Sequence, residues 1–311
     1  MRLRTPASSK PPEVDSIRHA KRPLCADLSR DNSESLAATA SRIDHWLLIE
    51  YRGLWSRAPL DRSGLGDEVK AHLRGQLAAR PPSRLLFVKR PDRRSRSGVV
   101  VLHGSTSERG ARFFRRELGA YEELLELDLG SADDPALDHP LFVVCTHGKR
   151  DRCCAFYGRA LYDALRDELD DDWVWQCTHV GGDRFAGNVV VFPEGLYYGR
   201  VDAAAAPRLI DAHLDGRVEL EAYRGRCSYS FAAQAAEDAI RRELGLTRIE
   251  DLSLVAETRV PGGWSVAFRA RGGAVHEREV VVGHGELTYL TCDAGALRRP
   301  RHYRAKAAPA G

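Results

Sequence analysis

The chain has 311 residues, of which 43% are hydrophobic and 29% are charged, and its formal net charge is only +3. This composition is ordinary for a globular protein, and the length suffices for a large buried core in one to three domains. The weak and scattered positive charge gives no support for nucleic-acid binding. No apolar run approaches the roughly 20 residues that a membrane-spanning helix needs.

Seven cysteines, an odd number, are spread over the chain. A secreted disulfide framework would have a dense and even set, and the N-terminus lacks the apolar segment of a secretory signal. We therefore expect a cytoplasmic protein with thiols that are free or bound to metal. Residues 1–40, rich in Ser, Pro, Arg and Asp, predict a mostly disordered leader with some order near Leu24–Leu28. Cys25, within it, is expected to be a partly buried thiol rather than a ligand.

Residues 41–135 predict an N-terminal α/β segment, because apolar runs of strand length alternate with a run of helical spacing. The predicted strands and helix lie at 45–53, 65–80 (helix), 84–90 and 97–104. Residues 111–129 combine a helical start with a strand-like end. This segment contains no catalytic constellation, and His45 and His103 are expected to have structural roles.

Residues 136–225 predict elements in the order β-α-β-β-α, which is the order of a thioredoxin-like domain. The two strands of the hairpin at 188–201 flank the turn Pro193-Glu194-Gly195, and Pro207 suits the first turn of the following helix. Residues 226–295 predict a C-terminal α+β segment, with a helix that ends at Gly245 and three strands after it. Residues 296–311 form a basic tail that we expect to be solvated and disordered.

The stretch 141–188 holds four of the seven cysteines and repeats the triplet Cys-Thr-His. Each copy follows an apolar strand and precedes a turn that contains glycine. Cys145 and Cys154 are nine residues apart, on a loop long enough to bring both sulfurs to one centre. His179 and Asp183 lie on either side of a Gly-Gly pair. Two thiolates, one imidazole and one carboxylate can therefore converge from two loops at neighbouring strand ends.

Four interpretations fit this pattern. An iron–sulfur cluster suits soft thiolates on a long loop. Structural zinc with two Cys, one His and one Asp is equally allowed by ligand type. A thiol redox site would pair Cys153 with Cys154, or Cys145 with Cys154. In the fourth interpretation these are the buried cysteines of a core strand.

The runs CTHGKRDRCC, HVGGDRFAGN and FPEGLYYGRV resemble the sucrase/ferredoxin-like family, whose members carry a thioredoxin-like ferredoxin domain. The family pattern is a Cys-x-His/Asn-Gly-x-Arg-Asp-x-x-Cys loop followed by a His-x-Gly-Gly-His loop. Residues 145–154 match the first loop, and His179, Gly181 and Gly182 match the second. In outline the resemblance covers residues 25–290, and Cys25 and HWLLIE look like parts of bacterial members. It is specific only in residues 140–200.

The resemblance implies a [2Fe–2S] cluster held by two cysteines and two histidines. By position the ligands are Cys145, Cys154 and His179, and Asp183 stands where the family has its second histidine. Cys177 is the rival for the fourth place. A carboxylate in place of an imidazole makes the cluster more negative by one charge, so reduction becomes less favourable. We predict a lower potential than that of a two-histidine member, with a pH dependence that comes from one imidazole only.

The residues around this stretch also lead to predictions. Four cations near an anionic cluster would raise its potential and offer a docking surface for an acidic redox partner: Lys149, Arg150, Arg152 and Arg184. We expect His147 to stabilise the turn, and the Gly181–Gly182 pair to give the backbone room around the cluster. Trp173 and Trp175 alternate on a strand, so at least one is expected in the core.

We therefore predict an electron-transfer protein with one [2Fe–2S] cluster and an unidentified redox partner protein, without nucleic acid or membrane. Related ferredoxins allow a homodimer. No pair of carboxylates supports glycosidase activity, despite the family's name. One alternative is a zinc-bound or metal-free thioredoxin-like interaction scaffold. The other is a thiol-disulfide reductase, although the chain lacks a Cys-x-x-Cys motif at the vicinal cysteines.

Overall fold

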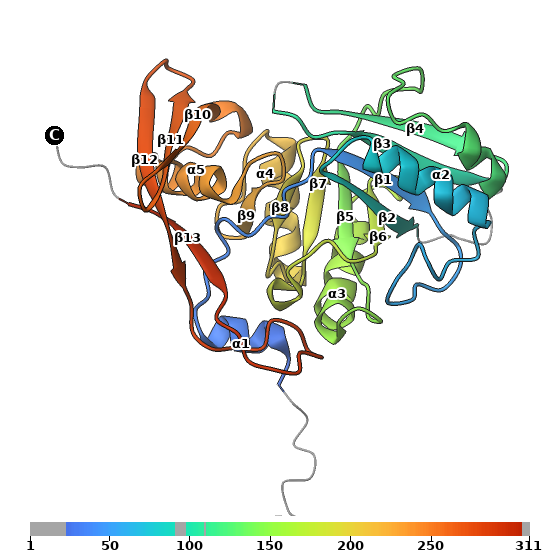
Figure 1. The fold of residues 1–311 in the computed structure, drawn as a ribbon, viewed down its shortest axis with the longest axis horizontal. Helices are drawn as coiled ribbons and strands as arrows, with labels where there is room; N and C mark the ends of the chain where they lie inside the picture. Colours follow the sequence, from blue (N-terminus) through green and yellow to red (C-terminus); the bar gives the residue numbers. More distant parts are fainter. Residues whose placement is uncertain (1–22, 91–97, 109, 307–311) are drawn as a thin grey trace, which may run out of the picture.

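The structure is a computed structural model that describes residues 23–90, 98–108 and 110–306. Its α/β fold, which confirms the predicted class, has a nine-stranded sheet, a separate four-stranded sheet and helices against both (Figure 1). The α-helices are α1 (Cys25–Asp31), α2 (Asp67–Ala78), α3 (Arg152–Glu168), α4 (Ala206–Leu214) and α5 (Phe231–Leu244). The short 3₁₀ helices are η1 (Tyr121–Glu126), η2 (Asp183–Phe185), η3 (Ala203–Ala205) and η4 (Ile249–Asp251).

The larger sheet contains two halves with the same connectivity. In each half a helix joins two parallel strands, and a hairpin follows whose first strand pairs antiparallel with the first parallel strand. The first half is β1 (His45–Glu50), β2 (Ser83–Lys89), β3 (Val99–Ser105) and β4 (Arg112–Leu118). The second half is β5 (Leu141–Cys145), β6 (Val174–Cys177), β7 (Val189–Phe192) and β8 (Leu196–Tyr198), followed by β9 (Tyr223–Arg226). The β-α-β-β part of the order predicted for the second half is therefore present in both halves, and the second half continues into the predicted α-helix, α4.

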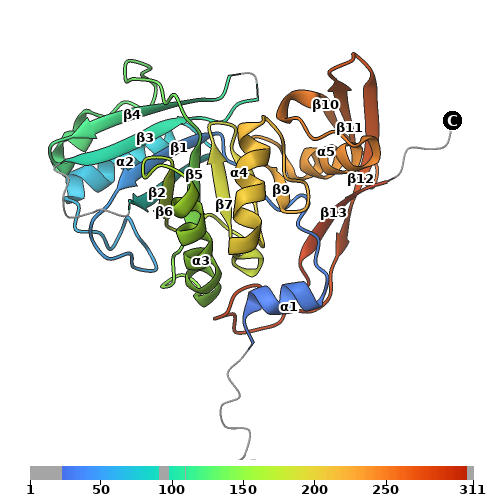
Figure 2. The ribbon, with the colours of Figure 1, turned by 180° about the vertical axis from the view of Figure 1, so that it is seen from behind.

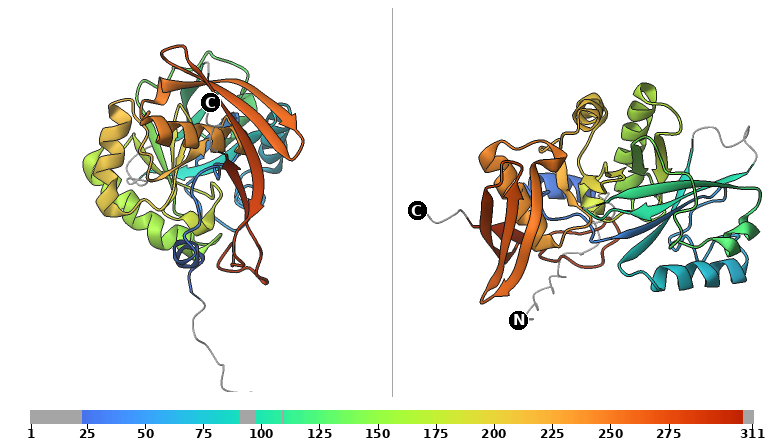
Figure 3. Two further views of the ribbon diagram at one scale, coloured as in Figure 1. Left: turned by 90° about the vertical axis from the view of Figure 1, so that its left-hand side faces the viewer. Right: turned by 90° about the horizontal axis from the view of Figure 1, so that it is seen from above.

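The two halves meet where β2 pairs antiparallel with β6, over only Val88–Cys177 and Lys89–Gln176. Because this junction is short, the sheet curls around an inner core that takes alternate residues from both halves, such as Trp46 from β1 and Val143 from β5. The intervening residues face outward. Helix α2 covers them on the first half, and α3 and α4 cover them on the second (Figure 3).

Strand β5, which leads into the predicted site, is buried along its whole length. Its sequence LFVVC is a continuous apolar run because both of its faces are covered, as is usual for a strand in the middle of a sheet. Leu141, Val143 and Cys145 face the inner core, whereas Phe142 and Val144 face α3 and α4. This alternation places Cys145 in the inner core, where Cys154 from the first turn of α3 also lies.

The C-terminal part forms a smaller antiparallel sheet against α5 (Figure 2). Its strands are β10 (Leu252–Val260), β11 (Gly263–Ala270), β12 (Val275–His284) and β13 (Arg301–Ala305). Helix α5 ends at Gly245, whose φ of 66° is the left-handed cap expected from the sequence. Between β12 and β13 the chain runs past α1, so that the loop at residues 285–300 lies beside this helix (Figures 1 and 2).

Helix α1 confirms the order expected near Leu24–Leu28, although Cys25 is fully rather than partly buried, and residues 1–22 lie outside the described residues. Two predictions of local structure are wrong. Residues 111–129 have the reverse order, a strand (β4) followed by a 3₁₀ helix (η1). The basic tail contains β13, which pairs with β12, whereas residues 307–311 lie outside the described part.

Candidate metal centre

The first loop of the site runs from the end of β5 to the start of α3. Cys145 is the last residue of β5 and is 1% exposed. The loop folds back because the backbone N–H groups of Arg150 and Asp151 donate to the carbonyl of His147. Asp151 then caps α3 by accepting a 2.8 Å hydrogen bond from the backbone of Cys153. This cap begins the helix early enough to bring Cys154, also buried, back beside Cys145.

The second loop follows β6, which lies next to β5 in the sheet. Cys145 and Cys177 occupy matching positions at the ends of these parallel strands. The chain then passes His179 and turns through Gly181 and Gly182, with φ values of 100° and 78°, into η2. Residues with a side chain rarely adopt such φ values, so the Gly-Gly pair permits the sharp turn that returns Asp183 to His179.

The two loops bring together all four residues predicted as ligands. One donor atom each of Cys145, Cys154 and His179 lies within 4.8 Å of the other two. The thiol of Cys154 donates a 3.2 Å hydrogen bond to Oδ1 of Asp183, and Nδ1 of His179 lies 2.9 Å from the same oxygen. Asp183 thus contacts two of the three donors, whereas the set whose donor atoms all lie within 4.8 Å of one another consists of Cys145, Cys154 and His179.

The donor atoms are mostly shielded from water. Both cysteines are 1% exposed and Asp183 is 3% exposed, whereas the side chain of His179 is 23% exposed. Nδ1 of His179 is buried and makes no hydrogen bond of good geometry despite its closeness to Asp183. A buried ring nitrogen without such a bond is available as a ligand.

The electrostatics of the group are strongly coupled. Hydrogen bonds from Cys154 and then Cys177 lower the pKa of Cys145 well below its ordinary value. The bond to Cys145, together with burial, raises the pKa of Cys154. Burial alone would lower the pKa of His179, but Asp183 and Cys145 outweigh it and raise this pKa to about 9. A metal ion that binds these atoms must displace their protons, so binding releases protons.

Cys177, the rival fourth ligand, is fully buried in the inner core and lies opposite Cys145 in the pairing of β5 with β6. Burial, followed by the interaction with the thiol of Cys145, raises the pKa of Cys177 well above its ordinary value. Asp183, in contrast, touches donors from both loops, Cys154 and His179. This arrangement favours Asp183 over Cys177 as the fourth donor.

Two buried polar residues that the sequence did not reveal hold the second loop. Arg224 of β9 is 1% exposed and donates to the carbonyl of Gly181 (3.1 Å) and to the side chain of Asn188 (2.7 Å). Asn188 in turn donates to the carbonyl of Gly182 (2.8 Å). Burial lowers the pKa of Arg224 to about 10, so its guanidinium stays charged at neutral pH. The only feature of the sequence that could have indicated this role of Arg224 is its position within a short strand.

The predictions for residues around the site agree with the structure in part. His147 is buried and its Nε2 donates to the carbonyl of Ser56, which ties the first loop to the chain after β1, in line with the expected structural role. Arg184 is paired with the buried Glu34 at 2.8 Å and is therefore not a free docking cation. Lys149 and Arg152 are exposed and Arg150 is half-buried. Trp175 lies in the core, as predicted for one of the two tryptophans.

The cysteines form no disulfide, and all seven lie in the described part of the chain. The vicinal pair diverges, since Cys153 contacts Cys25 at 3.5 Å whereas Cys154 contacts Asp183.

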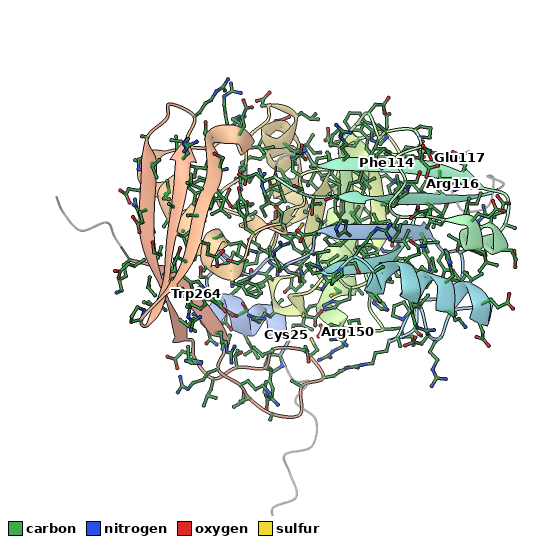
Figure 4. The ribbon with its side chains drawn as sticks, turned by 45° about the horizontal axis from the view of Figure 1, so that its top comes forward. Cys25, Phe114, Arg116, Glu117, Arg150 and Trp264 are labelled. Carbon is green, nitrogen blue, oxygen red and sulfur yellow. The ribbon has the colours of Figure 1, made fainter. Side chains whose placement is uncertain are left out.

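A hollow of about 1100 Å³, lined by Arg115, Arg116 and Trp173 among others, lies beside β4 and α3. Its lining contains no cysteine, and Figure 4 shows Arg116 and Glu117 well apart from Cys25 and Arg150.

The residues present fit a resident metal centre by the chemistry of their donors. Thiolates and imidazole are the ligands of iron–sulfur clusters and of zinc, and a carboxylate binds either ferric iron or zinc. Burial of the donors on two loops at adjacent strand ends suits a centre that must be shielded from water. The fold and the site thus define a thioredoxin-like α/β protein with a candidate Cys₂HisAsp metal centre.

Residues 36–225, more than half of the chain, match the sucrase/ferredoxin-like family. The chain belongs to this family. The family match includes both halves of the large sheet and both loops of the site, and it ends just before β9 is complete.

Several curated yeast proteins named "Altered inheritance of mitochondria protein 32" are similar to this chain. The protein from Meyerozyma guilliermondii is 30% identical over 122 residues, which are 36% of this chain and 43% of that protein. The protein from Eremothecium gossypii is 30% identical over 29% of this chain and 33% of its own length, and that from Debaryomyces hansenii is 33% identical over 27% and 35%. The match therefore spans less than half of these relatives. They are yeast proteins, so the resemblance to bacterial members stays a prediction.

Among solved structures, a variant of the thioredoxin-like [2Fe–2S] ferredoxin from Aquifex aeolicus is similar over 28% of this chain and all of its own, with 18% identity and a TM-score of 0.26. The thioredoxin-like arrangement described above rests on the strand order and not on this likeness. Within the described residues, no helix has the length and apolar character required to cross a membrane.

Proposed function

We propose that this protein is an electron carrier that holds one [2Fe–2S] cluster with Cys145, Cys154, His179 and Asp183. The single observation that carries the proposal is the buried convergence of these four donors from two loops. Membership of the sucrase/ferredoxin-like family supports it. The cluster supplies the one-electron chemistry, and the chain's own residues hold it, shield it and set its charge.

The first contribution of the chain's own residues is to the net charge around the cluster. Two thiolates and one carboxylate are three negative ligands, and the guanidinium of Arg224, buried behind the second loop, offsets part of this charge. Its hydrogen bonds to Gly181 and Asn188 keep the second loop in place. Neither bond uses a donor atom of Cys145, Cys154, His179 or Asp183, so these atoms are left for the cluster. Outer residues of this kind orient the ligands of metal sites and tune the metal.

The exchange of electrons requires a route to the surface. Of the four donor residues, His179 is the most exposed, so its ring is the edge at which a partner protein would approach. Lys149, Arg152 and the 67% exposed Phe156 lie on the first loop and on the first turns of α3. A surface with this combination of cations and an exposed aromatic ring suits an acidic redox partner.

A second candidate function is that of a zinc-bound interaction scaffold. The observation in its favour is the tight spacing of the Cys145, Cys154 and His179 donors, since atoms within 4.8 Å of one another can also surround one ion. For a thiol-disulfide reductase, the vicinal pair is disfavoured because Cys153 and Cys154 contact different partners, whereas Cys145 and Cys154 lie close enough to remain a candidate pair. A cytoplasmic location and a homodimer remain proposals, and the relatives' name refers to mitochondria.

Visible absorption of the purified full chain separates these functions. We expect a red-brown protein whose colour is lost in C145S and C154S and is kept in C227S. Cys227 is an equally buried cysteine whose thiol bonds to Thr106 at 3.1 Å, outside the site, so it controls for loss of a core thiol. A colourless protein that holds one zinc ion at these residues would reject the electron carrier and support the scaffold.

A further inference from the structure

A second cluster of cysteines lies outside the centre described above. It consists of Cys25 in α1, Cys153 in the first turn of α3, and Cys292 in the loop between β12 and β13, together with Asp151. All four residues are buried. The chain separates Cys25 from Cys153 by 128 residues and from Cys292 by 267, so only the fold brings them together.

The three sulfurs form a nearly equilateral triangle. The Sγ distances are 3.5 Å for Cys25–Cys153, 3.4 Å for Cys153–Cys292 and 3.7 Å for Cys25–Cys292. A tetrahedral zinc ion with Zn–S bonds of about 2.3 Å places its sulfur ligands about 3.8 Å apart. The triangle therefore has the size that one such ion requires, before any adjustment of the side chains.

Asp151 provides the fourth corner. Its two carboxylate oxygens lie 3.8 Å from Sγ of Cys25. Oxygen and sulfur ligands of one tetrahedral zinc ion are about 3.6 Å apart, which is close to this distance. The backbone N–H groups of Cys153 and Cys292 donate to the two oxygens at 2.8 Å and 2.7 Å. These bonds hold the carboxylate against the sulfurs while each oxygen keeps a further lone pair for a metal.

A disulfide, an iron–sulfur cluster or simple apolar packing accounts for less of this arrangement. A disulfide would use two of the three thiols and would leave the third beside a buried carboxylate. An iron–sulfur cluster spreads its ligands over more than one iron, whereas these three sulfurs surround one point. Packing as small apolar groups explains why the thiols are buried, but not why all three meet at the carboxylate that caps α3.

We propose that Cys25, Cys153, Cys292 and Asp151 form a structural zinc site. Zinc is the metal of choice because three thiolates and one carboxylate close a buried tetrahedron and leave no open position for a substrate. The site would fasten α1 and the loop before β13 onto the start of α3 (Figures 1 and 2). Figure 4 labels Cys25 beside Arg150, the neighbour of Asp151, at this junction.

The site lies directly next to the first centre, because Cys153 and Cys154 are consecutive. Helix α1 also contacts η2, which carries Asp183. A zinc ion here would thus hold the frame on which both loops of the first centre rest. The proposal does not depend on the nature of the metal in that first centre.

The test is metal analysis of the full chain purified from zinc-replete cells and dialysed against a chelator. We expect one zinc ion per chain in the native protein and in the C227S control, and loss of that zinc in C25S and in C292S. Absence of zinc from the native protein, even after incubation with Zn²⁺, would overturn the proposal. Zinc that persists in both C25S and C292S but disappears in C145S would overturn it as well, because the ion would then occupy the first centre.

A second measurement tests the proposal on the native chain, in case C25S and C292S do not fold. The native chain, freed of zinc and titrated with Co²⁺, should develop the intense ligand-field bands of tetrahedral cobalt with thiolate ligands, and Zn²⁺ should abolish them. The same titration on C145S, which lacks a donor of the first centre, should give unchanged bands. No cobalt bands in C145S would refute the second site. Iron analysis of the same samples tests the electron-carrier proposal separately.

Discussion

Asp183 is the residue on which the character of the candidate centre depends most. Its carboxylate contacts the thiol of Cys154 and the ring of His179, and it stands where the resemblance to the family implies a second histidine. A carboxylate adds a negative charge that an imidazole does not. The buried position of Asp183 strengthens this effect, because water screens the charge less there.

We predict that D183H raises the reduction potential of the cluster. Replacement of two cysteines by two histidines raises the potential of [2Fe–2S] centres by roughly 250 mV or more, so the loss of one negative ligand should give a rise on the order of 100 mV. A redox titration followed by visible absorption measures it. A potential equal to that of the native protein would show that Asp183 is not a ligand.

Gly182 is the residue of the second loop that tolerates least change. A Cβ atom there would overlap Nη2 of Arg224 and lie 2.9 Å from its Cζ, and four hydrogen bonds hold that guanidinium group in place. We predict that G182A costs about 1–3 kcal/mol more stability than G216A, because it adds steric overlap to backbone strain. Gly216 has a similar φ of 69° but open space around it, so it reports the strain alone.

Urea unfolding of the two glycine variants gives the comparison. Equal losses of the free energy of unfolding would contradict the tight packing between Gly182 and Arg224. The iron content of G182A should also fall, whereas that of G216A should stay at the native level.

At the level of single residues, the sequence indicated which side chains meet in the candidate centre but not which residues support them. Cys145, Cys154, His179 and Asp183 lie within 39 positions of one another, and their spacing in two loops indicated that they converge. Arg224 reaches the loop from β9, and the cluster of Cys25 and Cys292 joins α1 to the loop before β13. Contacts over such separations depend on the tertiary fold, which local pattern does not contain.

Among the elements, the segment from α1 to β1 makes buried contacts with distant parts of the chain that the sequence did not indicate. Glu34, 4% exposed, accepts hydrogen bonds from Ser29 (2.9 Å) and Arg184 (2.8 Å), and it lies 3.5 Å from His302 of β13. One carboxylate thus links the N-terminal segment to η2 and to the C-terminal sheet.

We predict that E34Q lowers the free energy of unfolding by about 1–3 kcal/mol, because it leaves the largely buried Arg184 without its anionic partner. The matched variant E221Q removes a carboxylate whose side chain is 78% exposed and pairs with Arg242 at 3.3 Å. Its loss should be about 0–0.5 kcal/mol. Similar losses in the two variants, measured by urea unfolding, would argue against a structural role of Glu34.

Helix α4 carries a titratable group with a defined effect on stability. His213 is buried against Phe142, and burial lowers its pKa although Glu194, 3.8 Å away, opposes this. Below the unfolded value of about 6.5, the unfolded chain binds a proton that the folded chain does not, so stability falls as the pH falls.

We predict that H213Q loses less stability than the native protein between pH 7.5 and pH 5.5. The difference is at most about 1.4 kcal/mol per pH unit, the limit for one proton. Urea unfolding at the two pH values checks it. An identical pH dependence in both proteins would show that His213 does not contribute.

Helices and strands were predicted correctly where the hydrophobic periodicity of the sequence is strong. The apolar runs of β1, β5 and β7 and the helical spacing in α2, α3 and α5 were predicted correctly because burial requires them. Strand β4, RFFRREL, was misjudged because its charged residues resemble a helix start, whereas its pairing with β3 decides its state. The polar β13 and the short β9 were missed as well, because neither has an apolar alternation and each is a strand through its pairing with the preceding strand.

For the molecule as a whole, the main finding is that two thioredoxin-like halves share one curled sheet, and that only the second carries the donor residues. The sequence predicted the halves as separate segments, with the thioredoxin-like order only in the second. Their union involves the short β2–β6 pairing and the buried Arg90, which bonds to Glu50 of the first half and to Asp172 of the second. Such cross-links have no local signature. The first half and the C-terminal sheet thus frame the centre in the second half.

An iron and acid-labile sulfide assay on the full chain, combined with EPR of the reduced protein, decides whether the centre is a [2Fe–2S] cluster. We predict two irons and two sulfides per chain, with an EPR signal that appears on reduction by one electron and is absent from C145S. A protein without iron and sulfide, prepared anaerobically and after attempted reconstitution, would contradict the electron-carrier proposal and leave Cys145, Cys154, His179 and Asp183 as a site for another metal.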